Sequence, residues 1–474
     1  MEFKDLSLLE IIEKINSKKT SKEEVYNYFL DRIKKHDWDL NAFNYVNEDW
    51  LSKIDWKLAW VPIAIKDIFC EKNILTTCAS KMLADFKPPY NATVIDRLEK
   101  EWMSSIWKVN MDEFAMGSTT ASSAFKVTLN PHWTNRIPGW SSGGSAASVA
   151  AWLVPASLGT DTGWSIRQPA SLCWVIWFKP SYWRNSRYWV IAMASSLDTP
   201  WTITKTVKDS AFLYEIMNWE DNLENTTIPW KDIIDPKIWD RKDFSWIKVW
   251  VPKEYFWEWL DDWVREVIEK AIDDMKKAWA EIIDIELPMT KYAIATYYIL
   301  MPAEVSTNLS RFDWIRYWHV SNKTYSSMDE MYLNNRWEWF WDEVKRRIIL
   351  GSYVLSAWYY DAYYKKAAKV RTLIIKDFQK AFEKCDVIVW PVSPSVAWEV
   401  WEKSSDPLKM YLSDAYTIPA SLAWLPAISV PAWFAISTDS KKEKLPVWIH
   451  MITAQFQEQK LFEIANAYEQ LSKK

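Results

Sequence analysis

Two glycine- and serine-rich stretches of this chain contain the residues best suited to acyl chemistry. Residues 138–145 include Gly139 and Ser141, and residues 159–169 include Ser165. Backbone N–H groups of such loops can converge on an oxyanion, and a serine hydroxyl supplies the nucleophile. Phosphate binding is the weaker interpretation, because neither a Walker A motif nor G-x-G-x-x-G is present. Either stretch alone would be explained as a flexible turn, but the pair favours acyl transfer.

A serine nucleophile needs a base, and a lysine is the better candidate here than a histidine. The chain has four histidines, none in a recognisable catalytic setting, and no G-x-S-x-G elbow. Burial lowers the pKa of a lysine and leaves its amine neutral. Lys66 ends an apolar run that predicts a short buried strand over residues 61–67. It is the candidate base, with a solvent-facing strand end as the alternative.

The counts of tryptophan and glycine are the reverse of those in an ordinary protein. The 474 residues include 36 Trp and 7 Gly, whereas glycine normally makes up roughly 7% and tryptophan is not among the common residues. Several Trp stand where glycine is expected: Trp279 after a predicted helix, Trp56 in a turn, and Trp140 beside Gly139. We predict that most of these positions are UGA codons that the organism reads as glycine.

Composition excludes several other classes of protein. The chain is 49% hydrophobic, with 58 basic and 62 acidic residues and a net charge of −4, which argues against disorder and against a basic nucleic-acid footprint. Four cysteines without a C-x-x-C pattern give neither a disulfide scaffold nor a zinc signature. No signal peptide and no apolar run of 18 residues is evident. We expect a soluble, cytoplasmic protein without a metal or a membrane contact.

The predicted elements alternate between strands and longer helices, which indicates an α/β sheet. Capping boxes at Ser7 with Glu10 and at Thr20 with Glu23 predict two helices that end near Ser17 and His36. Further helices are expected over 91–101 and 261–278, and further strands over 247–251, 387–389 and 427–430. We predict a single domain over 1–474, with the helical pair of residues 1–50 packed on it and 219–245 as an exposed connection.

Lys66, Ser141 and Ser165 follow one another at intervals of 75 and 24 residues, and this order and spacing resembles the amidase signature family. The resemblance implies a mixed β-sheet core surrounded by α-helices. It also implies a catalytic triad in which Ser165 is acylated, Ser141 relays the proton after a cis peptide bond, and Lys66 is the base. The implied oxyanion hole consists of the backbone N–H groups of Thr162, Gly163, Trp164 and Ser165.

Other segments narrow the resemblance to the A subunits of glutamyl-tRNA(Gln) amidotransferases. The matching segments are 76–81, 110–118, 301–309, 345–348, 359–366 and 411–414. The resemblance implies that the chain hydrolyses glutamine and passes ammonia to the B and C subunits of a heterotrimer. There Glu-tRNA(Gln) is amidated with ATP and Mg²⁺ held by one of these partners, so this chain itself carries no cofactor. Use of Asp-tRNA(Asn) is left open.

Glutamine recognition requires a cation for the α-carboxylate and an anion for the α-ammonium group. The fork of an arginine suits the first role. The resemblance assigns that role to Arg347 or its neighbour Arg346, and the second to Asp414. The full set of predicted substrate-binding residues is Met116, Gly117, Tyr297, Arg346, Arg347 and Asp414.

Two rival functions remain open at this point. A free-standing amidase would act on another small amide without partner subunits. A tryptophan-rich binding protein for sugar or nucleic acid would use the 36 Trp literally and would have no glutaminase activity.

Overall fold

The computed structural model describes residues 2–45, 61–101, 103–117, 119–163, 165, 167–255, 260–312, 324–400, 413–436 and 443–473. Its strands form one mixed eleven-stranded sheet in the order β1-β3-β2-β4-β6-β5-β10-β11-β9-β7-β8. The strands are β1 (Phe43–Tyr45), β2 (Val61–Lys66), β3 (Met103–Val109), β4 (Ser157–Asp161), β5 (Ile176–Lys179), β6 (Thr199–Thr204), β7 (Lys248–Trp250), β8 (Glu281–Ile283), β9 (Val387–Pro391), β10 (Ala427–Ile436) and β11 (Lys444–Ile452).

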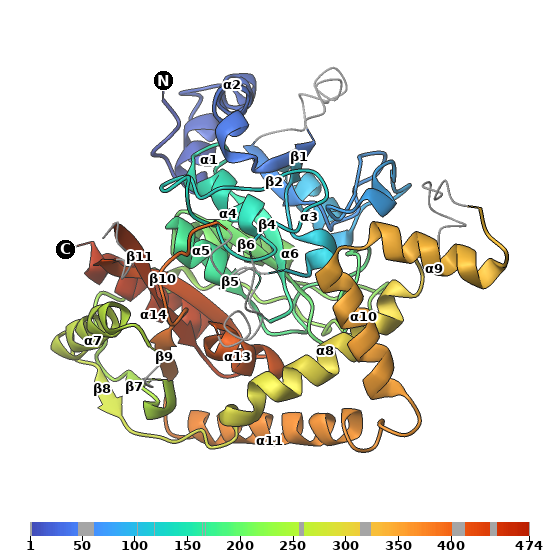
Figure 1. The fold of residues 1–474 in the computed structure, drawn as a ribbon. Helices are drawn as coiled ribbons and strands as arrows, with labels where there is room; N and C mark the ends of the chain where they lie inside the picture. The colour runs from blue at the N-terminus through green and yellow to red at the C-terminus, as the bar shows by residue number, and fades with distance from the viewer. Residues whose placement is uncertain are drawn as a thin grey trace.

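Helices surround this sheet, with α1 and α2 at one end of the molecule and α8, α10 and α11 at the other (Figure 1). The helices are α1 (Leu8–Asn16), α2 (Lys22–Leu40), α3 (Thr93–Lys100), α4 (Gly143–Ala150), α5 (Arg167–Cys173), α6 (Val207–Met217), α7 (Asp262–Lys277), α8 (Ala293–Leu309), α9 (Met328–Trp339), α10 (Asp342–Leu355), α11 (Tyr364–Phe382), α13 (Ile418–Leu422) and α14 (Glu458–Ser472). The predicted α/β fold with a mixed sheet inside helices is confirmed.

The strands that carry the site lie in the middle of the sheet. β2 runs parallel to both β3 and β4, so their carboxyl ends reach the same edge. β6 runs antiparallel to β4, with Asp161 opposite Thr199 and Ser157 opposite Ile203. All six residues of β2 are buried, so Lys66 ends a buried apolar strand as predicted.

The predicted start of the first helix is confirmed and that of the second is wrong. Ser7 and Glu10 form both hydrogen bonds of the capping box of α1. In α2 the N-cap is Ser21, whose hydroxyl accepts from the backbone N–H of Glu24, whereas Thr20 donates to the Glu24 carboxylate. α2 also continues beyond the predicted end near His36, because its buried face extends to Leu40.

The other predicted elements correspond to α3, α7, β2, β7, β9 and β10. β10 is longer than the predicted 427–430, because it pairs with β11 over its whole length, including an irregularity between Pro431 and Trp433. Between α6 and β7 the predicted connection 219–245 contains one short 3₁₀ helix, η4 (Pro236–Asp240), as its only assigned helix or strand. Within the described ranges, no helix has both the length and the apolar character needed to cross a membrane.

Two closely packed helices carry three of the predicted substrate-binding residues. α8 carries Tyr297, and α10 carries Arg346 and Arg347. A Cβ atom at Gly351 of α10 would overlap the carbonyl oxygen of Pro302 in α8. Glycine at this position therefore permits the close approach of α10 to α8.

Candidate active site

The amine of Lys66 lies at the centre of a buried group of hydroxyls. Its Nζ is 2.7 Å from Ser141 Oγ, 2.8 Å from Ser142 Oγ and 3.0 Å from Thr160 Oγ1. The side chain is fully buried. Burial lowers the pKa of Lys66 to about 7, against the opposing pull of Asp161 and other buried acids. A lowered pKa is the direction expected of a lysine that accepts a proton from Ser141, and that role of Lys66 stays a prediction.

The two glycine- and serine-rich stretches meet at Ser142. Its backbone N–H donates to the carbonyl oxygen of Ser165 at 3.0 Å, and its hydroxyl donates to the carbonyl of Thr160 at 3.2 Å. Ser165 lies just before α5 and is buried. The structure therefore brings Lys66 and Ser141 into direct contact and joins the Ser165 segment to them through Ser142.

The predicted cis peptide bond before Ser141 is wrong, since the described residues contain no cis peptide bond. The trans form of a non-proline bond is lower in energy by roughly 2.5–4 kcal/mol. In this chain the preceding residue is Trp140, whose buried indole packs against Trp398 at a ring-centroid distance of 5.3 Å.

The predicted oxyanion loop connects β4 to α5. Thr162 and Gly163 are buried, and Trp164 lies outside the described residues. A Cβ atom at Gly163 would come within 2.9 Å of the Tyr297 ring, so glycine allows the loop to pack against that ring. Arg167 donates to the Gly163 carbonyl and pairs with Asp161 at 3.3 Å. The role of these backbone N–H groups stays a prediction.

Asp414 fits the predicted role of a buried anion. Its Oδ2 accepts from the Tyr298 hydroxyl at 2.8 Å, whereas its Oδ1 has no hydrogen-bond partner within the described part of the chain. Burial raises the pKa of Asp414 well above its usual range, and the Tyr298 hydrogen bond and Arg347 counteract this only in part. A bound ammonium group would satisfy the open oxygen and would favour the ionised carboxylate, which burial alone disfavours.

The structure distinguishes between the two candidate arginines. Arg347 is buried, and its Nε is 2.8 Å from Glu343 Oε1. The side chain of Arg346 is half exposed and pairs with the other oxygen of Glu343. Arg347 is also close enough to Asp414 to lower the pKa of that carboxyl. Of the two predicted alternatives, Arg347 therefore belongs to the interior of the site.

Met116 and Gly117 follow the 3₁₀ helix η3 (Glu113–Ala115). Met116 is fully buried, and a Cβ atom at Gly117 would overlap the Asp112 carboxyl group. Their role in substrate binding stays a prediction. No group of described His, Cys, Asp or Glu residues is arranged to hold a metal ion.

Sequence reasoning missed three residues of this site. Ser142 and Thr160 contact the Lys66 amine, and Tyr298 contacts Asp414. Ser142 and Tyr298 each directly follow a residue that was predicted, so the Ser-Ser and Tyr-Tyr pairs were the available signal. Thr160 could have been found from its place near the carboxyl end of the strand next to β2.

Comparison with known proteins identifies the family. The sequence profile of the Amidase family matches residues 24–462. A protein of Thermoanaerobacter pseudethanolicus, named as the A subunit of glutamyl-tRNA(Gln) amidotransferase, is 44% identical over 485 residues, covering 100% of this chain and 98% of the relative. A Coxiella burnetii protein of the same name is 45% identical over 476 residues, covering 98% and 97%.

Solved structures agree with the sequence relatives. The A subunit from Thermotoga maritima superimposes with a TM-score of 0.81 at 37% identity, covering 98% of this chain and 95% of that one. The peptide amidase of Stenotrophomonas maltophilia shares the fold with a TM-score of 0.79 at 20% identity, covering 99% and 98%. From the profile match and these full-length relatives, the chain belongs to the Amidase family.

Proposed function

We propose that this chain hydrolyses glutamine as the A subunit of a glutamyl-tRNA(Gln) amidotransferase. The observation that carries this proposal is the 44% identity to relatives of that name over the full length of the chain. The buried contact between Lys66 and Ser141 supports amide hydrolysis as its chemistry. The ammonia released is used by B and C subunits to convert Glu-tRNA(Gln) to Gln-tRNA(Gln) in the cytoplasm, with ATP and Mg²⁺ held by a partner.

The proposed reaction begins with acylation of Ser165. Neutral Lys66 takes a proton from Ser141, and Ser141 takes a proton from Ser165. At the same time the Oγ of Ser165 attacks the side-chain carbonyl carbon of glutamine. Backbone N–H groups of residues 162–165 stabilise the tetrahedral oxyanion. The C–N bond then breaks, the nitrogen receives the proton back, and ammonia leaves. Water hydrolyses the glutamyl ester by the same proton path and releases glutamate.

Two charged residues orient the substrate in this proposal. Arg347 binds the α-carboxylate, and the open Oδ1 of Asp414 accepts from the α-ammonium group. Support comes from the burial of both side chains and from the unpartnered oxygen of Asp414 among the described residues. An amide without an α-ammonium group would leave Asp414 Oδ1 without a partner among the described residues, which favours glutamine over a simple amide.

The test is a glutaminase assay of the purified chain with and without its partner subunits. Ser165→Ala should abolish glutamine hydrolysis and glutamyl-enzyme formation. The complex should still amidate Glu-tRNA(Gln) from free ammonia, because one of the partners performs that step. Hydrolysis at the wild-type rate by Ser165→Ala would exclude this nucleophile. Full activity on other small amides, with none on glutamine, would favour a free-standing amidase.

A further inference from the structure

Asp198 is a buried carboxylate that contacts the predicted oxyanion loop. Its Oδ1 accepts from the Thr162 hydroxyl at 2.6 Å. Its Oδ2 accepts from the backbone N–H groups of Met193 at 2.8 Å and Ala194 at 2.9 Å. Only 5% of the residue is exposed. Hydrogen bonds to an ionised carboxylate are short and strong, so the contact with Thr162 fixes the position of that hydroxyl.

The register of the sheet explains why Asp198 meets Thr162. Asp161 at the end of β4 pairs with Thr199 at the start of β6, and the two strands are antiparallel. Thr162, which follows Asp161, therefore faces Asp198, which precedes Thr199. The segment that contains Asp198 is itself held by α8. Asn308 donates to the Met193 carbonyl at 3.0 Å, and Ser196 donates to Glu304 at 2.6 Å. Asp198 thus connects the first residue of the oxyanion loop to a supported part of the fold.

We propose that Asp198 is a positioning residue for amide hydrolysis, which holds Thr162 so that the backbone of residues 162–165 faces the developing oxyanion. This inference rests on the proposed amide hydrolysis at Ser165. It assigns Asp198 no contact with substrate. Oxyanion stabilisation depends on donors that are fixed before the reaction, and a small misplacement of such groups lowers the rate steeply.

The test compares variants that keep or remove the contact. Asp198→Asn and Thr162→Val should each lower kcat for glutamine hydrolysis about 10- to 100-fold, because the loop is no longer held in place. KM should change little, since the binding residues are untouched. Thr162→Ser keeps the hydroxyl and should restore most of the rate. The double variant should be no worse than the single ones, because both remove the same contact.

Asp209, in the first turn of α6, is a matched control. It is buried and accepts from the backbone N–H groups of Leu8 at 3.2 Å and Leu9 at 3.0 Å. Burial raises the pKa of Asp209 to about 6, the same value as for Asp198. Asp209→Asn should lower the melting temperature and leave kcat unchanged. An equal loss of kcat in Asp209→Asn, or a normal kcat in Asp198→Asn, would overturn the positioning role.

A second readout separates this inference from the identity of the substrate. Acylation of Ser165 by p-nitrophenyl acetate passes through an oxyanion but does not require glutamine. Slower acylation in Asp198→Asn than in Asp209→Asn supports the positioning role even if the protein does not hydrolyse glutamine. Equal acylation rates in these two variants reject the positioning role even if glutamine is the substrate.

A second inference comes from the backbone at the tryptophan positions. Of sixteen non-glycine residues with positive φ in the described ranges, six are Trp. Tryptophan makes up 36 of 474 residues, so a proportional share would be about one. The six are Trp152, Trp174, Trp189, Trp246, Trp279 and Trp424, with φ between 57° and 77°. A bulky side chain is disfavoured in this left-handed region, where glycine is favoured.

Four of these six residues follow the end of a helix in the Schellman arrangement. After α7, Trp279 donates to the Lys276 carbonyl and Ala280 to the Met275 carbonyl, both at 3.0 Å. This confirms the prediction that Trp279 occupies a left-handed position. The residue that follows Trp152, Trp174 or Trp424 likewise donates its backbone N–H to the carbonyl five positions before it, at 2.9–3.1 Å. Glycine is the usual residue at this position.

The remaining two left-handed residues are the third members of turns. The backbone N–H of Val190 donates to the Arg187 carbonyl and closes the turn that contains Trp189. The N–H of Ile247 donates to the Phe244 carbonyl and closes the turn that contains Trp246, and both bonds are 3.0 Å long. A positive φ at the third position of such a turn calls for glycine or asparagine. Trp246 is also 94% exposed, so packing of its indole does not compensate for the backbone conformation.

A different observation concerns six other tryptophans inside the molecule. Their buried indole N–H groups have no hydrogen-bond partner among the described residues: Trp107, Trp140, Trp177, Trp201, Trp250 and Trp448. A buried indole N–H normally finds a partner, and leaving one unpaired is unfavourable. Most of the six lie in strands, where the indoles of Trp177 and Trp201 stack on each other at 5.4 Å.

We infer that these twelve positions are glycine in the native polypeptide. Peptide mass mapping of the protein purified from its own organism tests this directly. Glycine at all six left-handed positions is the expected result, and the intact mass should fall well below 56.1 kDa. Tryptophan at any of those six positions, or an intact mass of 56.1 kDa, would overturn the inference.

Discussion

Lys66 and Lys205 lie at opposite ends of the same group of strands and have similarly perturbed amines. Lys66 ends β2, whereas Lys205 follows β6, which runs antiparallel to β4. Burial lowers the pKa of each lysine to about 7. Lys66 lies among three hydroxyls, but Lys205 lies 3.6 Å from the centre of the Trp152 ring and 3.4 Å from the Ala150 carbonyl.

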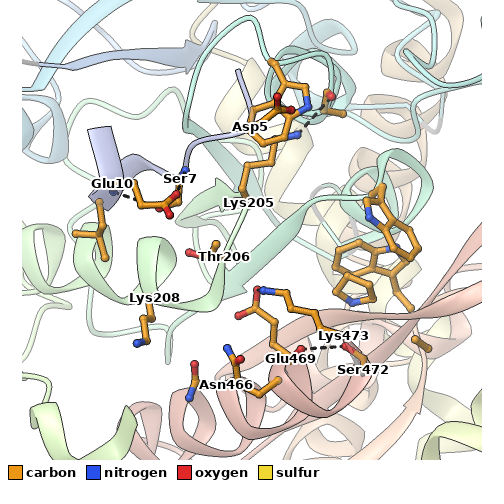
Figure 2. Close-up of a pocket in the computed structure, with 18 of the residues that line it drawn as sticks. Asp5, Ser7, Glu10, Lys205, Thr206, Lys208, Asn466, Glu469, Ser472 and Lys473 are labelled. Carbon is orange, nitrogen blue, oxygen red and sulfur yellow. Dashed lines mark hydrogen bonds and ion pairs between the residues drawn. The ribbon is translucent and has the colours of Figure 1, made fainter. Parts of the chain in front are cut away.

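Among the described residues, no serine or threonine hydroxyl is hydrogen-bonded to the Lys205 amine, which contacts the Ala150 carbonyl and the Trp152 ring. Lys205 lines a cavity of about 820 Å³ beside Asp5, Ser7 and Glu469 (Figure 2). No hydrogen bond between Lys205 and a described serine is found there, whereas Ser141 lies 2.7 Å from Lys66. The two lysines therefore differ in the hydroxyls around the amine and not in the direction of the pKa shift, and the proposed base role of Lys66 depends on that difference.

The largest effect should come from replacing Lys66 with arginine, with the same replacement at Lys205 as its control. Lys66→Arg should lower glutamine hydrolysis about 1,000-fold or more, because arginine stays protonated and cannot act as the base. Lys205 lies at the other end of the strands, away from Ser141, so Lys205→Arg should leave the rate unchanged. Steady-state glutaminase kinetics measure both. An active Lys66→Arg enzyme would give Lys66 only a structural role.

A nearly as large effect should follow from the residues beside the two catalytic serines. Recombinant protein with Trp at positions 140 and 164 should be inactive, because these residues directly precede Ser141 and Ser165 in sequence, in loops whose other members are small. Trp140→Gly combined with Trp164→Gly should restore glutaminase activity, whereas Trp152→Gly beneath Lys205 should not. Equal activity with either residue at 140 and 164 would contradict this prediction.

Much of the site could be predicted because its chemistry depends on residue type and order. Lys66 was recognisable from an apolar strand with a charge at its end, and Ser141 from its glycine-rich loop. Asp198 could not be found in this way, because its contact with Thr162 depends on the pairing of β4 with β6. The Tyr-Tyr pair pointed to Tyr298, but which of the two tyrosines contacts Asp414 depends on the packing of α8. Neither contact leaves a periodic signal in the sequence.

Local patterns predicted helices and strands better than their ends. The capping box of Ser7 and Glu10 was correct, whereas Thr20 competes with Ser21 one residue later for the same helix start. The length of β10 depends on β11, which lies after it in the sequence. Such ends are decided by tertiary pairing, which single-sequence reasoning does not contain.

The pH dependence should separate activity from stability at the two lysines. Glutamine hydrolysis should rise with pH through about 7, because Lys66 must lose its proton to act as the base. Between pH 7 and 10.5 the unfolded chain binds more protons at each lysine than the native protein. The free energy of unfolding should therefore increase over this window, by up to ~1.4 kcal/mol per pH unit for each lysine.

Lys66→Met and Lys205→Met should flatten this rise in stability to a similar extent, as measured by urea unfolding at several pH values. Only Lys66→Met should abolish glutaminase activity. A Lys205→Met variant that loses activity, or that shifts the rate profile, would mean that the two ends of the strands are coupled.

The smallest effects concern single tryptophans outside the catalytic loops. Trp279→Gly should stabilise the recombinant protein by about 1 kcal/mol, because it relieves a bulky side chain at φ 77°. Trp152→Gly relieves a similar backbone conformation but loses the contact with Lys205, which is worth roughly 0.5–1 kcal/mol. Its gain should therefore be smaller than that of Trp279→Gly.

Trp38→Gly provides the opposite control for these two variants. Trp38 is 73% exposed, close to the 75% of Trp279, but it lies inside α2. Glycine within a helix is destabilising by roughly 0.5–1 kcal/mol, so Trp38→Gly should lower the urea midpoint while Trp279→Gly raises it. A shift of both midpoints in the same direction would show that loss of the indole, and not the left-handed backbone, determines the effect.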